Sequence, residues 1–150
     1  MSVTPEDIAT AHEQIKPYVL RTPTVAAPRL GEPLGARLWL KLENLQYTGS
    51  FKDRGSCYKL QRLTDGASPP AGVIAASAGN HAQGVAHHAH RLGLQATIVM
   101  PWTTPFAKVE RTEGHGARVV LHGESLAESY QHALEIADAE QLTFIHPYDD

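Results

Sequence analysis

Residues 43–55 read Glu-Asn-Leu-Gln-Tyr-Thr-Gly-Ser-Phe-Lys-Asp-Arg-Gly, and they place Lys52 just inside the start of a predicted helix. Ser50 and Asp53 form the S-x-x-D pattern of a capping box, so we expect Ser50 as the N-cap and Lys52 as the second helical residue. The positive end of the helix dipole disfavours an ammonium there. It favours the neutral amine, which is the form that attacks a carbonyl and holds a Schiff base.

A second segment, Ala-Ser-Ala-Gly-Asn-His-Ala-Gln-Gly over 76–84, lies where a predicted strand ends and a predicted helix begins. Free backbone N–H groups and a positive helix end at the carboxyl edge of a sheet make an anion-binding place. Taken alone, each motif has a plainer interpretation. Lys52 could be a solvated surface lysine, and 76–84 could be a small turn with a helix cap.

Together the motifs carry a resemblance. The strings KLENLQYTGSFKDRGS (41–56) and ASAGNHAQG (76–84) closely resemble the threonine/serine dehydratases of the tryptophan-synthase-like, fold type II pyridoxal-phosphate enzymes. Three further strings extend the resemblance over nearly the whole chain: ATIVMPWTTPFAKV (96–109), GARVVLHG (116–123) and TFIHPYDD (143–150).

The resemblance implies roles for individual residues. Lys52 would hold pyridoxal phosphate, Phe51 would pack against the cofactor region unless it is a plain core residue, and Asn80 would bond the cofactor's phenolic oxygen. The substrate would bind at the second motif, through Ser77, Ala78, Gly79, Asn80, His81 and Gln83.

The implied reaction is dehydration and deamination of L-threonine or L-serine to a 2-oxo acid and ammonia. The freed amine of Lys52 would remove the alpha proton, with the cofactor ring as electron sink. Serine racemases have a serine at the position of Ala78, where it exchanges the alpha proton on the opposite face. Alanine has no proton to exchange, so Ala78 favours elimination. The resemblance also implies a place in amino-acid metabolism, including isoleucine biosynthesis.

Alternatives to this reaction remain open. Serine racemases and beta-replacing or threonine-synthase-like enzymes share the fold, although the histidine and HAQG continuation after SAGN favour dehydratases. A catalytically silent fragment or regulatory module is another alternative. The family's glycine-rich phosphate loop, pyridine-nitrogen partner and monovalent-cation ligands would follow residue 150. We therefore expect a truncated chain, nearly inactive alone, and a homo-oligomer for the complete enzyme.

The apolar pattern predicts an α/β fold, a three-layer parallel sheet with helices on both faces. The prolines within 21–35 predict an irregular connection there. The predicted helices are 4–15, 52–63, 80–92, 105–113 and about 126–137, and the predicted strands are 37–42, 73–76, 97–100, 119–121 and 144–145. We expect 1–65 to be the amino-terminal segment of the large cofactor domain, including the lysine helix, and 66–150 to be a small α/β domain.

The composition indicates which classes of binding partner to expect. The chain is 42% hydrophobic with a net charge of −3, and its Lys and Arg residues are scattered. Neither a nucleic-acid surface nor a polybasic membrane patch is indicated, so the expected partner is a small amino-acid substrate. Cys57 is the only cysteine, which excludes an internal disulfide. The acidic amino terminus does not match a secretory signal, and no apolar run is long enough to span a membrane, so we expect a cytoplasmic protein.

Nine histidines raise the question of a metal site. His87, His88 and His90 lie together on one predicted helix, but no third ligand completes the His87/His90 pair. We therefore expect no metal and interpret these histidines as a polar helix face.

Overall fold

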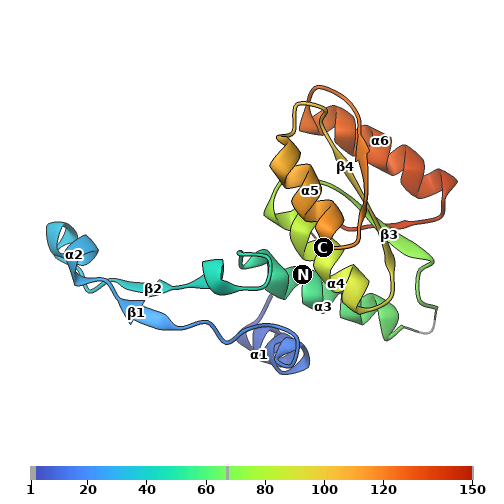
Figure 1. Ribbon diagram of the computed structural model, residues 1–150. Coiled ribbons are helices and arrows are strands. Elements are labelled where there is room, and N and C mark those ends of the chain that lie inside the picture. The colour runs from blue at the N-terminus through green and yellow to red at the C-terminus, as the bar shows by residue number, and fades with distance from the viewer. Residues whose placement is uncertain (1–2, 67, 150) are drawn as a thin grey trace.

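The computed structural model describes residues 3–66 and 68–149, and it combines a layered α/β unit with a projecting arm (Figure 1). A four-stranded sheet with the order β5-β4-β3-β6 forms the middle layer, and every neighbouring pair is parallel. The strands are β3 (Gly72–Ala76), β4 (Gln95–Met100), β5 (Arg118–Leu121) and β6 (Thr143–Phe144). The predicted parallel α/β sheet is confirmed.

Helices cover both faces of the sheet, which confirms the three predicted layers. Helices α4 (Asn80–Arg91) and α5 (Phe106–Gly114) lie on one face, and α6 (Leu126–Ala139) lies on the other (Figure 1). Helix α3 (Lys52–Thr64) packs against α4. Within β3, Val73 and Ala75 join the core below α4, while Ile74 and Ala76 join the core below α6.

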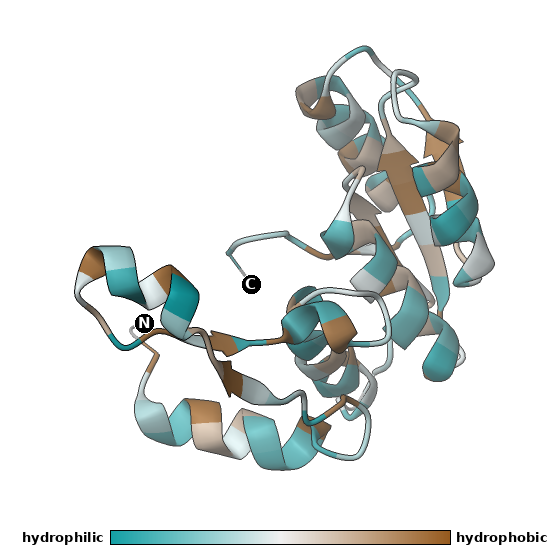
Figure 2. Cartoon of the chain, turned by 60° about the vertical axis from the view of Figure 1, so that its left-hand side comes forward, coloured by the Kyte–Doolittle hydropathy of each residue, from teal (hydrophilic) through white to brown (hydrophobic). Residues whose placement is uncertain are grey.

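The central strands are buried on both faces, as expected of parallel strands between helices. Every residue of β3 is buried, and β4 is buried from Ala96 onward. Figure 2 shows the resulting hydrophobic strands inside the α/β unit. The carboxyl ends of β3 and β6 lie side by side because these strands pair in parallel, and this edge carries the site described below.

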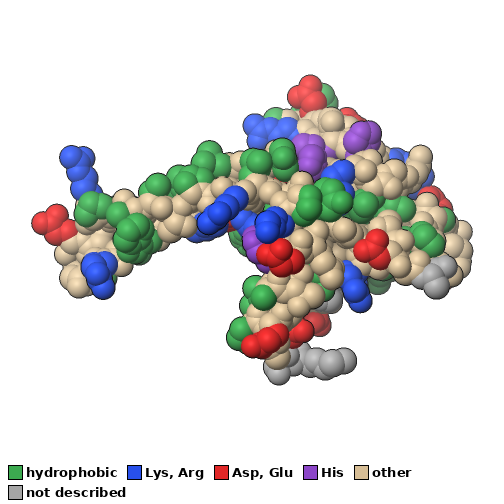
Figure 3. Space-filling view, turned by 90° about the horizontal axis from the view of Figure 1, so that it is seen from below, with side chains coloured by type: hydrophobic (Ala, Val, Ile, Leu, Met, Phe, Trp, Pro, Cys, Tyr) green, Lys and Arg blue, Asp and Glu red, His purple; other side chains and the backbone are tan. Residues whose placement is uncertain are grey.

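The arm corrects one prediction. Residues 21–35 are not irregular, because β1 (Thr24–Ala26) pairs antiparallel with β2 (Trp39–Lys41), and α2 (Pro28–Gly31) and the 3-10 helix η1 (Glu32–Leu34) lie between them. Two of the prolines that suggested irregularity lie in the first turns of these short helices, where a missing N–H costs nothing. Hydrophobic side chains are exposed along the arm (Figure 3), among them Val25, Leu30, Leu34 and Trp39.

Helix α1 (Pro5–Ile15) starts with a reciprocal capping box between Thr4 and Asp7, and it packs against α3. A second 3-10 helix, η2 (Glu43–Leu45), follows β2. In the described ranges, no helix has the length and apolar character needed to cross a membrane. The division of the chain near 66–70 stays a prediction. Residues 1–2, 67 and 150, on which parts of it fall, lie outside the described residues.

Candidate functional site

Helix α3 begins at Lys52, so this lysine is the first helical residue and not the predicted second. The predicted capping box between Ser50 and Asp53 is wrong. The side chain of Ser50 accepts a hydrogen bond from the Lys52 backbone N at 3.1 Å, but the Asp53 carboxylate points to Thr48. Phe51 occupies the N-cap position without a capping side chain.

The Lys52 side chain reaches the segment that follows β6. Its Nζ donates a hydrogen bond to the Pro147 carbonyl oxygen at 2.6 Å. The same nitrogen lies 5.0 Å from the Tyr148 ring centroid and 5.8 Å from that of Phe51, within cation–π range. An amine, two aromatic rings and a backbone carbonyl therefore meet at one point.

A pocket of about 440 Å³ opens beside this lysine. Its walls come from α3, from His81 on α4 and from residues 145–148. Lys59 and Arg62 of α3 add two cationic side chains to the lining. This is the size of a small-molecule site, and its walls combine apolar and aromatic side chains with cationic ones.

His81 ties the start of α4 to the end of β6. The ring is buried, and its Nε2 lies 3.1 Å from the Ile145 carbonyl oxygen. A carbonyl oxygen only accepts, so His81 Nε2 carries the hydrogen of this bond. His81 is thus fixed in orientation on the wall of the pocket.

The remaining predicted substrate residues lie at the same edge of the sheet but do not line this pocket. Ser77, Ala78 and Gly79 are half-buried in the loop from β3 to α4, Asn80 is exposed, and Gln83 is half-buried. Gly79 is the N-cap of α4 and provides no capping side chain. Backbone N–H groups of the first turn are therefore available to an anion.

Gly84 explains why the two motifs adjoin. A Cβ atom at this position would lie 2.8 Å from Ser56 Oγ and 3.4 Å from the Lys52 carbonyl oxygen. Only a residue without a side chain allows α4 to approach the first turn of α3 this closely. The helix that begins at the second motif is therefore packed directly on the lysine turn.

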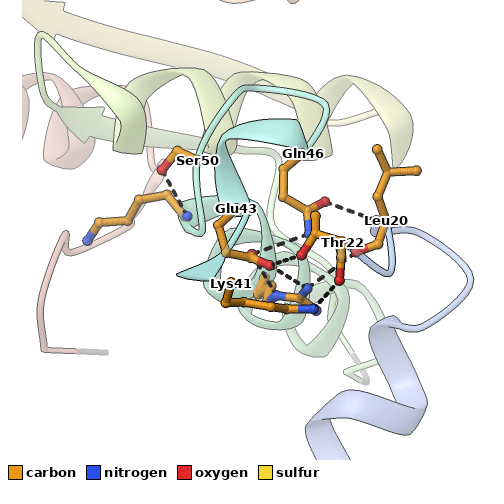
Figure 4. A network of polar contacts seen from close by, with 8 residues as sticks. Leu20, Thr22, Lys41, Glu43, Gln46 and Ser50 are labelled. Atoms are coloured by element: carbon orange, nitrogen blue, oxygen red, sulfur yellow. Dashed lines mark hydrogen bonds and ion pairs between the residues drawn. The ribbon is translucent and has the colours of Figure 1, made fainter. Parts of the chain in front are cut away.

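Figure 4 shows a polar network around Thr22, Glu43 and Gln46 that the sequence analysis did not identify. Arg54 donates two hydrogen bonds of 2.8 Å to the carboxylate of Glu43, and Thr22 Oγ1 donates one of 2.6 Å. Gln46 links Glu43 to the Leu20 carbonyl oxygen. The Arg54 hydrogen bonds, opposed by burial and supported by Thr22, lower the pKa of Glu43 to about 2.

We predict that Glu43→Gln removes a pH-dependent part of the free energy of unfolding. A carboxylate whose folded pKa is depressed stabilises the fold fully above its unfolded pKa of 4.5, and this stabilisation is lost as the pH falls through about 2. At about 1.4 kcal/mol per pKa unit, the contribution is at most on the order of 3 kcal/mol. Urea unfolding across this pH window measures it.

The control is Glu140→Gln, which removes an exposed ion pair with Arg118 and should change stability by less than about 1 kcal/mol. Parallel loss of stability by the wild type and Glu43→Gln between pH 4.5 and 2 would contradict the assignment of this pKa.

The histidines of α4 correct another prediction. His90 is exposed, but His87 is half-buried and His88 is fully buried, so they do not form a polar surface face. Burial lowers the pKa of His88 to about 3. Among the described residues, no three His, Cys, Asp or Glu side chains are grouped to hold a metal. Cys57 is buried.

Pro147 and Tyr148 are among the site residues that sequence reasoning missed, with Lys59 and Arg62. The position of Pro147 and Tyr148 in the sequence could have identified them. They follow a strand of the predicted parallel sheet, and the carboxyl ends of parallel strands share one edge of the sheet. The structure thus brings Lys52, Phe51 and His81 together with residues 145–148.

Comparisons with known proteins agree with this geometry. A family model described as pyridoxal-phosphate dependent enzyme matches residues 15–150. Over 145 residues the chain is 48% identical to the L-threonine dehydratase catabolic TdcB of Staphylococcus aureus (strain USA300), and the match covers 96% of this chain and 42% of that protein. A solved threonine deaminase from T.th. is 40% identical, with a TM-score of 0.86 over 99% of this chain and 46% of that one.

A solved pyridoxal 5'-phosphate-dependent aspartate racemase is 31% identical, with a TM-score of 0.93 over 100% of this chain and 47% of that one. The chain therefore spans less than half the length of each of these proteins.

Proposed function

Because the chain belongs to the family of pyridoxal-phosphate dependent enzymes, we propose that a protein containing it attaches this cofactor to Lys52. Membership confirms the resemblance inferred from the two motifs and the cofactor that it implied. The observation that carries the assignment to Lys52 is its amine in the wall of the 440 Å³ pocket, between the Phe51 and Tyr148 rings.

The residues of the pocket fit the chemistry of the cofactor. An amine can bond the cofactor's aldehyde carbon, and the rings of Phe51 and Tyr148 offer apolar contact to a planar heterocycle. The charges of Lys59 and Arg62 suit an anionic group. Asn80 and the Ser77–Gly79 loop, at the start of α4, are proposed to hold the cofactor's phenolic oxygen and the substrate carboxylate.

We propose that the reaction is dehydration of L-threonine or L-serine to a 2-oxo acid and ammonia. When bound, the cofactor supplies an electron sink for the substrate's alpha carbon. Lys52 takes the alpha proton on its amine. The N–H groups at the start of α4 orient the substrate through its carboxylate, together with Gln83. His81, held by the Ile145 carbonyl, is proposed to shape the wall beside the substrate.

The test supplies L-threonine and L-serine separately to a protein that contains this chain and measures the 2-oxo acid and ammonia. We expect equal amounts of the two products. A product that retains nitrogen, with no 2-oxo acid, would reject dehydration. A D-amino acid would favour racemisation, and a new amino acid formed only when a nucleophile is added would favour beta replacement.

Racemisation is the second candidate, favoured by the TM-score of 0.93 with the aspartate racemase. Ala78 opposes it, because its methyl group cannot return a proton to the face opposite Lys52. We predict that Ala78→Ser raises the share of D-serine formed from L-serine, measured by chiral chromatography alongside pyruvate. Ala127→Ser, at an exposed position of α6, is the control and should leave the ratio unchanged. Equal rates of D-serine and pyruvate formation by the unmodified protein would refute the argument from Ala78.

Three wider statements belong to the same proposal. The protein acts in the cytoplasm, it functions as a homo-oligomer, and its partner is a free amino acid rather than a nucleic acid or a membrane. The S. aureus relative is named as catabolic, which supports a role in amino-acid breakdown. A role in isoleucine biosynthesis is the alternative.

A further inference from the structure

Asp53 is a buried carboxylate directly after Lys52, and the proposed chemistry does not use it. Its side chain is fully buried in the first turn of α3. Burying a charge is costly unless hydrogen bonds compensate it. The groups that contact the Asp53 carboxylate therefore indicate its role.

Both carboxylate oxygens bind Thr48. Oδ1 accepts from Thr48 Oγ1 at 2.6 Å, and Oδ2 accepts from the Thr48 backbone N at 3.1 Å. These bonds close a loop over residues 48–53 that contains Lys52. Gly49 turns the chain within this loop at a φ of 75°, a conformation that favours glycine.

A second side chain, on the facing helix α4, lies near the same carboxylate. His88 on α4 is fully buried, and its Nε2 lies 3.8 Å from Asp53 Oδ1. This separation exceeds a hydrogen bond, and among the residues that the structure describes neither ring nitrogen of His88 has a hydrogen-bond partner. His88 and Gly84 are four residues apart and so share one face of α4, which contacts Asp53, Lys52 and Ser56.

Hydrogen bonds and the helix dipole, and not a charge on His88, compensate the buried charge of Asp53. Burial keeps His88 neutral, with a pKa of about 3, so His88 supplies no cation near neutral pH. The Thr48 N–H and O–H groups and the positive end of α3 stabilise the carboxylate instead. These are the interactions that also define where α3 begins, and Lys52 is its first residue.

We propose that Asp53 is a positioning residue for Lys52. The two hydrogen bonds from Thr48 to the Asp53 carboxylate fix the conformation of the 48–53 loop, and the neutral ring of His88 packs α4 against this loop. The amine of Lys52 is thereby aimed at the pocket beside His81. This inference rests on the proposed function, because it concerns the residue that would carry the cofactor.

The first experiment does not depend on the cofactor. Amide hydrogen exchange is measured for Asp53→Asn, Thr48→Val and Thr48→Ser, with Asp65→Asn as the matched control at the exposed far end of α3. We expect Asp53→Asn and Thr48→Val to speed exchange in the 48–53 loop by about tenfold, with α6 unchanged. Thr48→Ser keeps the hydroxyl and should exchange like the wild type.

The second experiment measures how readily Lys52 itself is labelled by the cofactor. The protein is treated with pyridoxal phosphate and borohydride, and peptide mass spectrometry gives the ratio of label on Lys52 to label on Lys108, an exposed lysine of α5. Asp53→Asn and Thr48→Val should lower this ratio by about tenfold, whereas Thr48→Ser and Asp65→Asn should leave it unchanged. The internal reference corrects for differences in the amounts of protein and reagent, and unchanged exchange in α6 from the first experiment shows that each variant is folded.

Each result has one meaning. Unchanged hydrogen exchange in the 48–53 loop of Asp53→Asn would show that the Thr48 hydrogen bonds do not fix this loop, and it overturns the proposal. Faster exchange with an unchanged labelling ratio makes Asp53 a purely structural residue and overturns the positioning role. Failure of the wild type to label Lys52 above Lys108, with a normally protected loop, overturns the proposed function and this inference together.

Discussion

Replacing Lys52 by alanine should lower amino-acid turnover by about 10³-fold or more in a protein that contains this chain. The substitution removes both the proposed attachment point for the cofactor and the proposed base for the alpha proton. The fold should survive, because the Lys52 side chain is only half-buried and contacts Pro147 and nearby aromatic rings at the pocket wall. Steady-state turnover of L-threonine, with far-ultraviolet circular dichroism as the folding check, measures the effect.

Lys59→Ala is the informative control, since this lysine lies on the same helix and lines the same pocket. We expect Lys59→Ala to weaken cofactor binding modestly and to keep most of the turnover. Equal loss in both variants would assign the function to the pocket's charge and not to one amine.

Gly84→Val should lower the free energy of unfolding by about 3 kcal/mol and reduce cofactor attachment at Lys52. The first atom of the new side chain already falls 2.8 Å from Ser56 Oγ, and the two methyl groups have no space between α3 and α4. The helices must separate, which moves the second motif away from the lysine turn. Urea unfolding and cofactor absorbance measure the two effects.

Gly55→Ala is the matched control on α3. A Cβ at this exposed position meets no atom of the described residues within 4 Å, so the exchange should stabilise the helix by up to about 1 kcal/mol. If Gly84→Val were as stable as the wild type, the close packing of α3 on α4 would not be what joins the two motifs.

The layered part of this fold could be predicted because local signals agreed with one another. Periodic alanine and valine residues marked α4, and short apolar runs marked β3 and β4, each within one or two residues of its observed bounds. In the arm, β2 lies within the predicted strand 37–42, but β1 and the short helices could not be predicted in the same way. The prolines of the arm break regular structure when read locally, and β1 is a strand only because β2, more than ten residues later, pairs with it.

The site was predicted in part for a similar reason. The motifs identified Lys52 and His81, but the contact of Lys52 with Pro147 joins residues 95 positions apart. The capping pattern misled because Asp53 had a competing pair of donors on Thr48. His88 is polar by residue type, yet the face it shares with Gly84 is turned toward α3.

The central claim is that Lys52 carries the cofactor, and mapping the covalent label tests it most directly. Pyridoxal phosphate is fixed with borohydride and the labelled peptide is sequenced by mass spectrometry. The account predicts most of the pyridoxyl group on Lys52, with only minor labelling of Lys41, Lys59 and Lys108. A label placed mainly on any of those three lysines would contradict it.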